Sequence, residues 1–221
     1  MPLRLTSSLD LAGLCRLAAQ QVNNLFPDGQ PVPADDLRPS AQQAMARLEH
    51  CFAHVANKYF FDGTGAVFDH LHGDQYAMWL YFLSNQLHRD GAPGHWCKKL
   101  FLLNKSLHGC DIFHEVVLPP VFLLVHPLGT VLGRAEYSDH LLVYQRCGVG
   151  SNRDVYPQLG RHLSLRPGSA VLGRCTIGDN VTVAAESLVL DRDIADNTTY
   201  IGNPRDCVSL PRQGTEKIWR S

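Results

Sequence analysis

The sequence lacks every segment that would carry a chain into or across a membrane. No run of about 18 consecutive apolar residues occurs in its 221 positions, so no membrane-spanning helix is predicted. The first residues, MPLRLTSSLDLAG, also lack the long apolar core and the small-residue cleavage site of a secretory signal. We therefore expect a cytoplasmic protein without a membrane partner.

A strong charge imbalance and paired cysteines are absent as well. The 20 Lys and Arg residues against 21 Asp and Glu residues give a net charge of −1, so no basic field would hold nucleic acid. The seven cysteines are scattered and form no CxxC pair. This spacing argues against a disulfide framework and against a zinc knuckle. We expect reduced, mostly buried cysteines.

Apolar residues recur at helical spacing through the first half of the chain. One stretch runs from Leu11 to Leu25 and stops at the breaker sequence PDG. After a proline-rich connector, Ser40 and Gln43 form a capping-box pattern ahead of a second stretch that reaches about Lys58. Two more stretches, around 79–86 and 96–107, stop at RDG and at a glycine. We expect an α-helical domain over residues 1–109.

The second half of the chain repeats with a period of six. The leading positions are aliphatic, and the positions four residues later are small or apolar: Leu159, Leu165, Val171, Ile177, Val183 and Val189, then Leu163, Ser169, Cys175, Val181 and Ser187. A helix repeats every 3.6 residues and a half-buried strand every 2, so neither fits. A period of six is typical of short strands stacked around a triangular coil, with the leading residue pointing inward.

The helical spacing of the first half and the six-residue period of the second half together predict an α+β protein. The N-terminal α-helical domain is followed by a left-handed parallel β-helix of hexapeptide repeats over residues 110–208 and a C-terminal tail over 209–221. Two interruptions mark the repeat: the step from 132 to 137 is one residue short, and the step from Val149 to Leu159 takes ten residues. The extra residues must form a loop, 151–157 (SNRDVYP). Insertions in solenoids are often on the binding face, so this loop is a candidate substrate contact.

Four segments together resemble serine acetyltransferases: LHGCDIFHEVVLPPVFLLVHPLGTVLG, VYQRCGVG, the hexads and the closing IGNPR. The resemblance covers about residues 70–208, and its more specific motifs are the GxDI entry and a His followed by xxGxVxG. It implies an acetyl-CoA-dependent O-acetyltransferase for a small hydroxylated, serine-like acceptor. Acetyl-CoA would be the donor substrate and no metal is expected. The resemblance also implies a homotrimer, and trimers of that family can pair into hexamers.

The resemblance implies catalytic residues as well. The family's run LDHATGIVVG corresponds to LVHPLGTVLG, so His126 takes the place of the catalytic histidine and Val125 that of an aspartate. Asp111 matches the aspartate that opens the first coil. A neutral imidazole can take the proton of an acceptor hydroxyl, and Gln145 or backbone N–H groups can stabilise the oxyanion. The group that orients His126 is left open between a backbone carbonyl, Glu115 and a carboxylate of the helical domain.

The acceptor side differs more from the family than the donor side. Tyr156 replaces the histidine of an Arg-His-Pro turn, and Arg153 is close enough in sequence to replace the arginine. Asp69, from the helical half, is a further candidate acceptor contact. We expect the donor to lie along one corner of successive coils, contacted by Gly168, Ser169, Gly173, Arg174, Asn180 and Ala185, with Arg205 of the GNPR segment near its phosphates.

Several alternatives stay open at this point. Asp139 and His140 form a second candidate Asp-His pair. His50 and His54 have the i, i+4 spacing of a metal pair, but no third ligand is evident. A sugar or another metabolite is an alternative acceptor. The substitution at Val125 also fits a trimeric scaffold that has lost activity.

Overall fold

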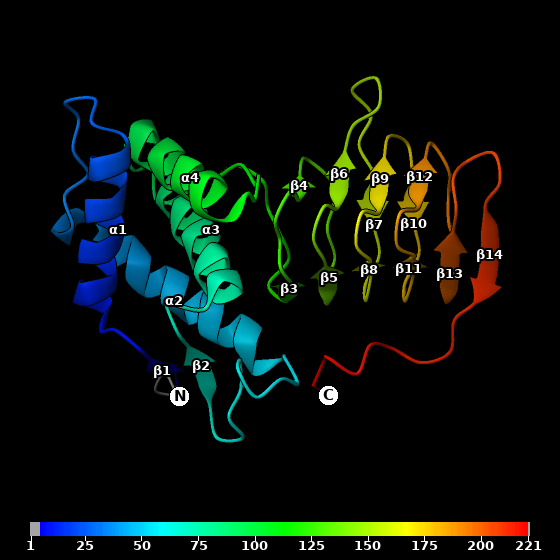
Figure 1. Ribbon diagram of the computed structural model, residues 1–221, viewed down its shortest axis with the longest axis horizontal. Coiled ribbons are helices and arrows are strands. Elements are labelled where there is room, and N and C mark those ends of the chain that lie inside the picture. Colours follow the sequence, from blue (N-terminus) through cyan, green and yellow to red (C-terminus); the bar gives the residue numbers. More distant parts are fainter. Residues whose placement is uncertain (1–4, 221) are drawn as a thin grey trace. The chain divides into compact units, whose positions relative to one another are not determined.

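The computed structural model describes residues 5–220, which form two compact units (Figure 1). The first unit comprises the residues up to His108 together with Phe113–Glu115 and Arg220. The second unit comprises Gly109–Ile112 and Val116–Trp219. Within residues 5–220, no helix has the length and apolar content needed to cross a membrane.

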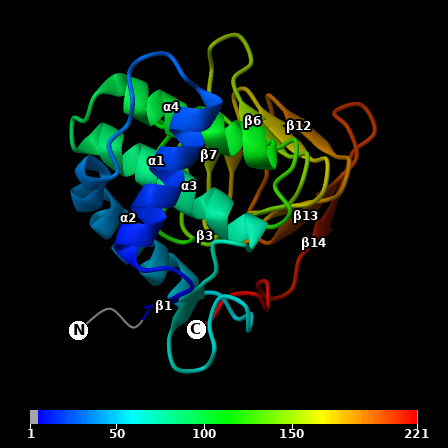
Figure 2. The ribbon, with the colours of Figure 1, turned by 60° about the vertical axis from the view of Figure 1, so that its left-hand side comes forward.

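Four helices make up most of the first unit. They are α1 (Leu11–Leu25), α2 (Arg38–Ala53), α3 (Gly73–Arg89) and α4 (Gly94–His108). The central helix is α3, which packs against both α2 and α4 (Figure 2). Every residue of α3 from Gln75 to Leu87 is buried. The four helical stretches predicted from the apolar spacing are therefore confirmed.

Local sequence explains where these helices begin and end. The carboxylate of Asp10 accepts a hydrogen bond from Gly13 N at 2.6 Å and so caps the start of α1. Pro27 follows the end of α1 and cannot continue the helix. Gly109 follows α4 with a φ of 60°, a left-handed conformation that glycine adopts without a steric penalty.

The predicted capping box at Ser40 and Gln43 is wrong. A 3₁₀ turn, Asp35–Leu37, leads directly into α2, so the helix begins at Arg38 with Pro39 in its first turn. Ser40 therefore lies inside the helix, where its hydroxyl donates a hydrogen bond to Asp90 at 2.6 Å.

The segment after α2 also differs from the prediction. The helix ends at Ala53, before the expected end near Lys58. The following residues form a loop and then β2 (Ala66–Phe68), which pairs in parallel with β1 (Leu5–Ser7). Strands of three residues are too short to produce a recognisable periodicity, so this sheet was not predicted from the sequence.

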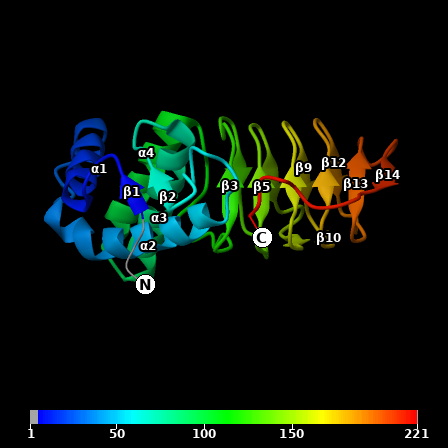
Figure 3. The same cartoon turned by 90° about the horizontal axis from the view of Figure 1, so that it is seen from below.

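The second unit is a parallel β-helix whose strands stack into three sheets (Figures 1 and 3). The first sheet contains β3 (Phe122–Leu124), β5 (Leu141–Val143), β8 (Ser164–Leu165), β11 (Thr182–Val183) and β13 (Thr198–Ile201). The second sheet contains β4 (Val131–Leu132), β6 (Gly148–Gly150), β9 (Ala170–Leu172) and β12 (Leu188–Leu190). The third sheet contains β7 (Gln158–Leu159) and β10 (Thr176–Ile177).

Aliphatic side chains stack inside this coil in register. Val183 pairs with Leu165, eighteen residues earlier, and Val189 pairs in the same way with Val171. All six leading residues of the predicted repeat are at most 3% exposed, and so are the five residues at the second position. Burying one such Val, Leu or Ile side chain contributes roughly 1.5–3 kcal/mol. The six-residue repeat is therefore confirmed as the core of the solenoid.

The long step before Leu159 forms the loop that its length predicted. Residues 151–157 leave the coil after β6 and return at β7 (Figure 1). Asn152 and Val155 exchange two backbone hydrogen bonds of 3.1 Å across a tight turn. The two central residues, Arg153 and Asp154, have φ values of 50° and 60°, which is typical of a type I′ turn.

The C-terminal tail covers the outer face of the first sheet. After β13 the chain turns back as β14 (Val208–Pro211), which pairs antiparallel with β13. The tail then runs along the solenoid (Figure 3). Glu216 accepts hydrogen bonds from Arg166 and Arg212, and the ring of Trp219 lies edge-on to His140 at 5.3 Å. The tail thus docks on the coil.

Candidate active site

Three corners connect the sheets of the β-helix. The first corner leads from the first to the second sheet through residues 125–130, 144–147, 166–169 and 184–187. The second corner leads to the third sheet through 133–135, 151–157, 173–175 and 191–193. The third corner returns to the first sheet through 138–140, 160–163, 178–181 and 195–197.

His126 lies at the first corner of the first coil. The chain takes eight residues from Leu124 to the next inward residue, Leu132, where a regular step takes six. Because of this extra length, His126 is exposed and has a φ of 50°, and its carbonyl accepts a hydrogen bond from Leu128 N at 2.7 Å. This third interruption of the repeat was not recognised in the sequence.

Counted from the end of the preceding strand, Gln145 is the equivalent of His126 on the next coil. Leu124 pairs with Val143, and His126 and Gln145 each follow two residues later. The Gln145 side-chain oxygen is buried and has no hydrogen-bond partner among residues 5–220. Such groups are uncommon in native structures and call for an explanation. The first corner therefore carries His126 and Gln145 on neighbouring coils.

Thr130 connects this corner to the next coil. Its side chain is fully buried, and its hydroxyl donates to Tyr144 O at 2.9 Å and accepts from Cys147 N at 3.3 Å. Asp111 N donates to Thr130 O at 2.9 Å, so the strand segment at Asp111 lies against the end of the His126 corner. Asp111 is thus part of the second unit, whereas Glu115 belongs to the first.

The thiol nearest in sequence to Gln145 is not a nucleophile. Cys147 is buried at the first corner, and burial raises the pKa of its thiol above the ordinary value. Six of the seven cysteines are buried and Cys207 is half-buried, as the sequence predicted.

Tyr156 and Arg153 lie on the second corner, in the 151–157 loop. Tyr156 is 41% exposed. Each strand of the second sheet begins after the first corner and ends before the second corner, so these residues and His126 lie at opposite ends of that sheet. A single chain therefore does not bring the predicted acceptor residues of the loop next to His126.

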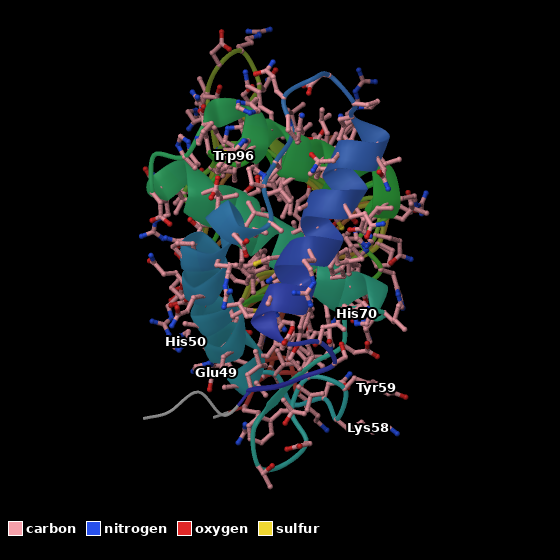
Figure 4. The ribbon with its side chains drawn as sticks, turned by 90° about the vertical axis from the view of Figure 1, so that its left-hand side faces the viewer. Glu49, His50, Lys58, Tyr59, His70 and Trp96 are labelled. Atoms are coloured by element: carbon pink, nitrogen blue, oxygen red, sulfur yellow. The ribbon has the colours of Figure 1, made fainter. Side chains whose placement is uncertain are left out.

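Asp69 lies in the first unit, between β2 and α3. Its carboxylate accepts a hydrogen bond from Leu71 N at 2.9 Å and lies 3.8 Å from His70 Nδ1. Ser8 Oγ is 2.8 Å from the same ring nitrogen of His70, a residue labelled in Figure 4. Ser8 and Asp69 therefore both face Nδ1 of His70, whereas the serine and the carboxylate of a catalytic triad contact opposite nitrogens of the histidine ring.

The residues predicted to contact the donor do not share one corner. Gly168, Ser169 and Ala185 lie on the first corner, Gly173 and Arg174 on the second, and Asn180 on the third; Arg205 follows the last coil, between β13 and β14. The prediction of a single corner is wrong because residues six apart fall on different corners. Only residues about eighteen apart return to the same corner.

The two alternative pairs, Asp139–His140 and His50–His54, make local contacts within the fold. Asp139 accepts a hydrogen bond from Val121 N at 3.0 Å, and the ring of His140 stacks on His162 at 4.4 Å. His50 is exposed on α2 (Figure 4), and its carbonyl is 2.8 Å from His54 Nδ1. Among residues 5–220, no group of three or more His, Cys, Asp or Glu side chains is placed to hold a metal ion.

Four helices followed by a β-solenoid of about four turns give this chain a hexapeptide-repeat, left-handed β-helix fold. Within it the chain is similar to serine acetyltransferases, which confirms the predicted resemblance and fold. A serine acetyltransferase of Synechococcus elongatus is 32% identical over 107 residues, 46% of this chain and 43% of that enzyme. The enzyme of Helicobacter pylori is 24% identical over 142 residues, 62% of this chain and 82% of that enzyme.

A solved structure extends the likeness to nearly the whole chain. The serine acetyltransferase of Brucella abortus in complex with coenzyme A superposes with a TM-score of 0.71 at 19% identity, covering 95% of this chain and 85% of that one. No protein-family model matches the sequence. The matched segment thus spans less than half the length of the cyanobacterial relative, while the likeness in fold to the Brucella structure covers 95% of this chain.

The contacts of Thr130 predict that Thr130→Val destabilises the His126 corner. The substitution preserves shape but leaves Tyr144 O without its hydroxyl donor and Cys147 N without its acceptor. We expect a loss of about 1–3 kcal/mol in the free energy of unfolding. Urea denaturation followed by far-UV circular dichroism measures it. Thr215→Val, in the exposed tail, is the control; equal stability of both variants would contradict this role of Thr130.

Proposed function

We propose that this chain transfers the acetyl group of acetyl-CoA to the hydroxyl of a small, serine-like acceptor. The observation that carries the proposal is that exposed His126 and Gln145, whose side-chain oxygen is buried, lie on adjacent coils of the first corner. The similarity of the solenoid to curated serine acetyltransferases supports the same reaction. The cytoplasm, expected from the sequence, is the proposed location.

His126 acts as the general base in this reaction. Its imidazole takes the proton from the acceptor hydroxyl while the hydroxyl oxygen attacks the thioester carbonyl. The negative charge that develops on the carbonyl oxygen is stabilised by the Gln145 amide or by backbone N–H groups of the corner. The carbon–sulfur bond then breaks, and the imidazolium returns its proton to the leaving thiolate. The products are the O-acetyl ester and CoA.

Asp111 is the carboxylate that we assign to the orientation of His126. Its backbone is hydrogen-bonded to Thr130, at the end of the same corner, and its register is fixed by pairing with Val131. A carboxylate that accepts from one ring nitrogen fixes the tautomer in which the other nitrogen is basic. This assignment leaves Val125 without a catalytic role.

The donor lies along the first corner in this proposal. Gly168, Ser169 and Ala185 are the predicted donor contacts that belong to this corner, and they continue it beyond Gln145. The similar Brucella enzyme was solved with coenzyme A. Arg153, Tyr156 and Asp69 stay predictions for acceptor recognition, and Gly173, Arg174, Asn180 and Arg205 stay predictions for the donor.

We also propose that the active form is a homotrimer. The outward residues of the second sheet are all apolar or glycine: Val131, Gly148, Ala170 and Leu188 on one row, then Gly133, Gly150, Leu172 and Leu190. Contiguous apolar surface of this kind marks an interaction site. Since His126 and Tyr156 lie at opposite ends of this sheet, cyclic packing would place the loop of one copy near the corner of the next.

The catalytic assignment predicts that His126→Gln strongly lowers turnover but leaves donor binding intact. Removing a general base lowers the rate by roughly a hundred- to ten-thousand-fold, while the CoA dissociation constant stays the same. Release of free CoA thiol with L-serine measures turnover, and isothermal titration measures binding. His50→Gln, on an exposed face of α2, is the matched control.

Three outcomes separate this proposal from its alternatives. Unchanged turnover in His126→Gln would remove the histidine from the mechanism. Turnover with a sugar or another hydroxylated metabolite, but not with L-serine, would change the acceptor and keep the chemistry. No thiol release with any acceptor, together with no CoA binding, would leave the scaffold without activity.

The apolar face predicts that Leu188→Glu converts the trimer to monomers. A carboxylate on this half-buried position would lose its hydration within an interface between copies, which is unfavourable for an unpaired charge. Light scattering coupled to size exclusion measures the mass. Thr176→Glu, on the exposed outer row of the third sheet, should remain trimeric. A monomeric wild-type protein would contradict the assembly.

A further inference from the structure

Four residues occupy equivalent positions along the first corner and form a row: Gly129, Arg146, Gly168 and Glu186. Their equivalence follows from the backbone, because Arg146 N donates to Leu128 O, Gly168 N to Gln145 O and Glu186 N to Pro167 O, at 2.9, 3.0 and 3.0 Å. All four have a positive φ, of 74°, 56°, 74° and 56°. Glycine and a charged residue alternate along the row.

The two charged residues of this row meet across the glycine between them. Arg146 Nη2 donates to Glu186 Oε1, although a whole coil separates the two residues. A Cβ atom added to Gly168 would lie 2.5 Å from Glu186 Oε1, so the carboxylate lies directly over this glycine. A Cβ atom on Gly129 would lie 3.4 Å from Arg146 Cγ. We call this contact the first-corner ion pair.

We infer that Arg146 binds the phosphate groups of the acyl donor and that Glu186 competes with the donor for its guanidinium. This inference rests on the proposed function and adds a donor-binding residue to it. The donor class is a thioester whose carrier ends in phosphate or pyrophosphate.

The position of the pair supports this role. Arg146 is one coil and Glu186 three coils along the corner from His126. Neighbouring coils are about 4.8 Å apart, the spacing of strands in a sheet. An extended donor with its thioester at His126 would therefore pass the ion pair. Gly129 and Gly168 have no side chains of their own, so the Arg146 side chain lies over Gly129 and the Glu186 carboxylate lies over Gly168.

The exposure of the first-corner ion pair would allow Arg146 to exchange Glu186 for a phosphate of the donor. The Arg146 and Glu186 side chains are 61% and 64% exposed, so solvent and salt screen their attraction. A phosphate offers a higher charge and can accept two parallel hydrogen bonds from a guanidinium. Arg166, the other arginine of this corner, is 31% exposed and is held by Glu216 and by the ring of Tyr144. Arg146 is therefore the exchangeable cation of the two.

Isothermal titration of CoA into the full chain tests the inference. Arg146→Gln should raise the dissociation constant by about tenfold, the effect of losing charge-assisted hydrogen bonds, and Arg146→Lys should restore part of the affinity. Glu186→Gln should lower it by about threefold because the competing carboxylate is removed. Arg161→Gln, on the third corner, is the matched control and should bind as the wild type does.

Pantetheine, which carries no phosphate, is the second probe. Its affinity should be the same for the wild type and for Arg146→Gln. Far-UV circular dichroism checks that each variant is folded; if Arg146→Gln does not fold, tighter binding by Glu186→Gln decides. Unchanged or tighter CoA binding by Arg146→Gln, or an equal loss for pantetheine, would overturn the inference alone. Absence of CoA binding by the wild type would overturn the proposed function with it.

Discussion

The stacking of aliphatic side chains inside the coil determines where every other residue of the solenoid lies. Leu165, Val171 and Ile177 define the three sides of one turn, and the next turn repeats them eighteen residues later with Val183 and Val189. Since these side chains are almost fully buried, a shift of one residue would expose the core. The register of the corners follows from this constraint, and with it the neighbours of each polar side chain.

The insertions in the regular repeat coincide with the exposed side chains of the candidate site. The eight-residue step from Leu124 to Leu132 exposes His126, while the regular step through the next coil keeps the Gln145 side-chain oxygen buried. The ten-residue step before Leu159 forms the loop with Tyr156 at the other end of the second sheet. A regular solenoid thus supplies the scaffold, and its insertions supply the candidate chemistry.

The period of six was sufficient to predict the fold and the inward residues, because it records burial directly. It was insufficient for the donor site: Arg174 and Asn180 follow Gly168 at steps of six and look equivalent to it in the repeat, yet they lie on other corners. The ion pair between Arg146 and Glu186 was equally hidden, since the two residues are forty positions apart and meet only through the coil. Ser40 is a similar case in the helical unit. Its capping-box pattern predicted a helix start, but the preceding 3₁₀ turn begins the helix earlier, at Arg38.

In the proposed mechanism, one corner of the solenoid carries both the base and the donor. A crystal structure of this chain with CoA tests it most directly. In that complex we expect the thiol sulfur beside His126, the pantetheine arm along Gln145 and Gly168, and a phosphate within hydrogen-bond distance of Arg146. CoA bound along the second or third corner, away from His126, would contradict it.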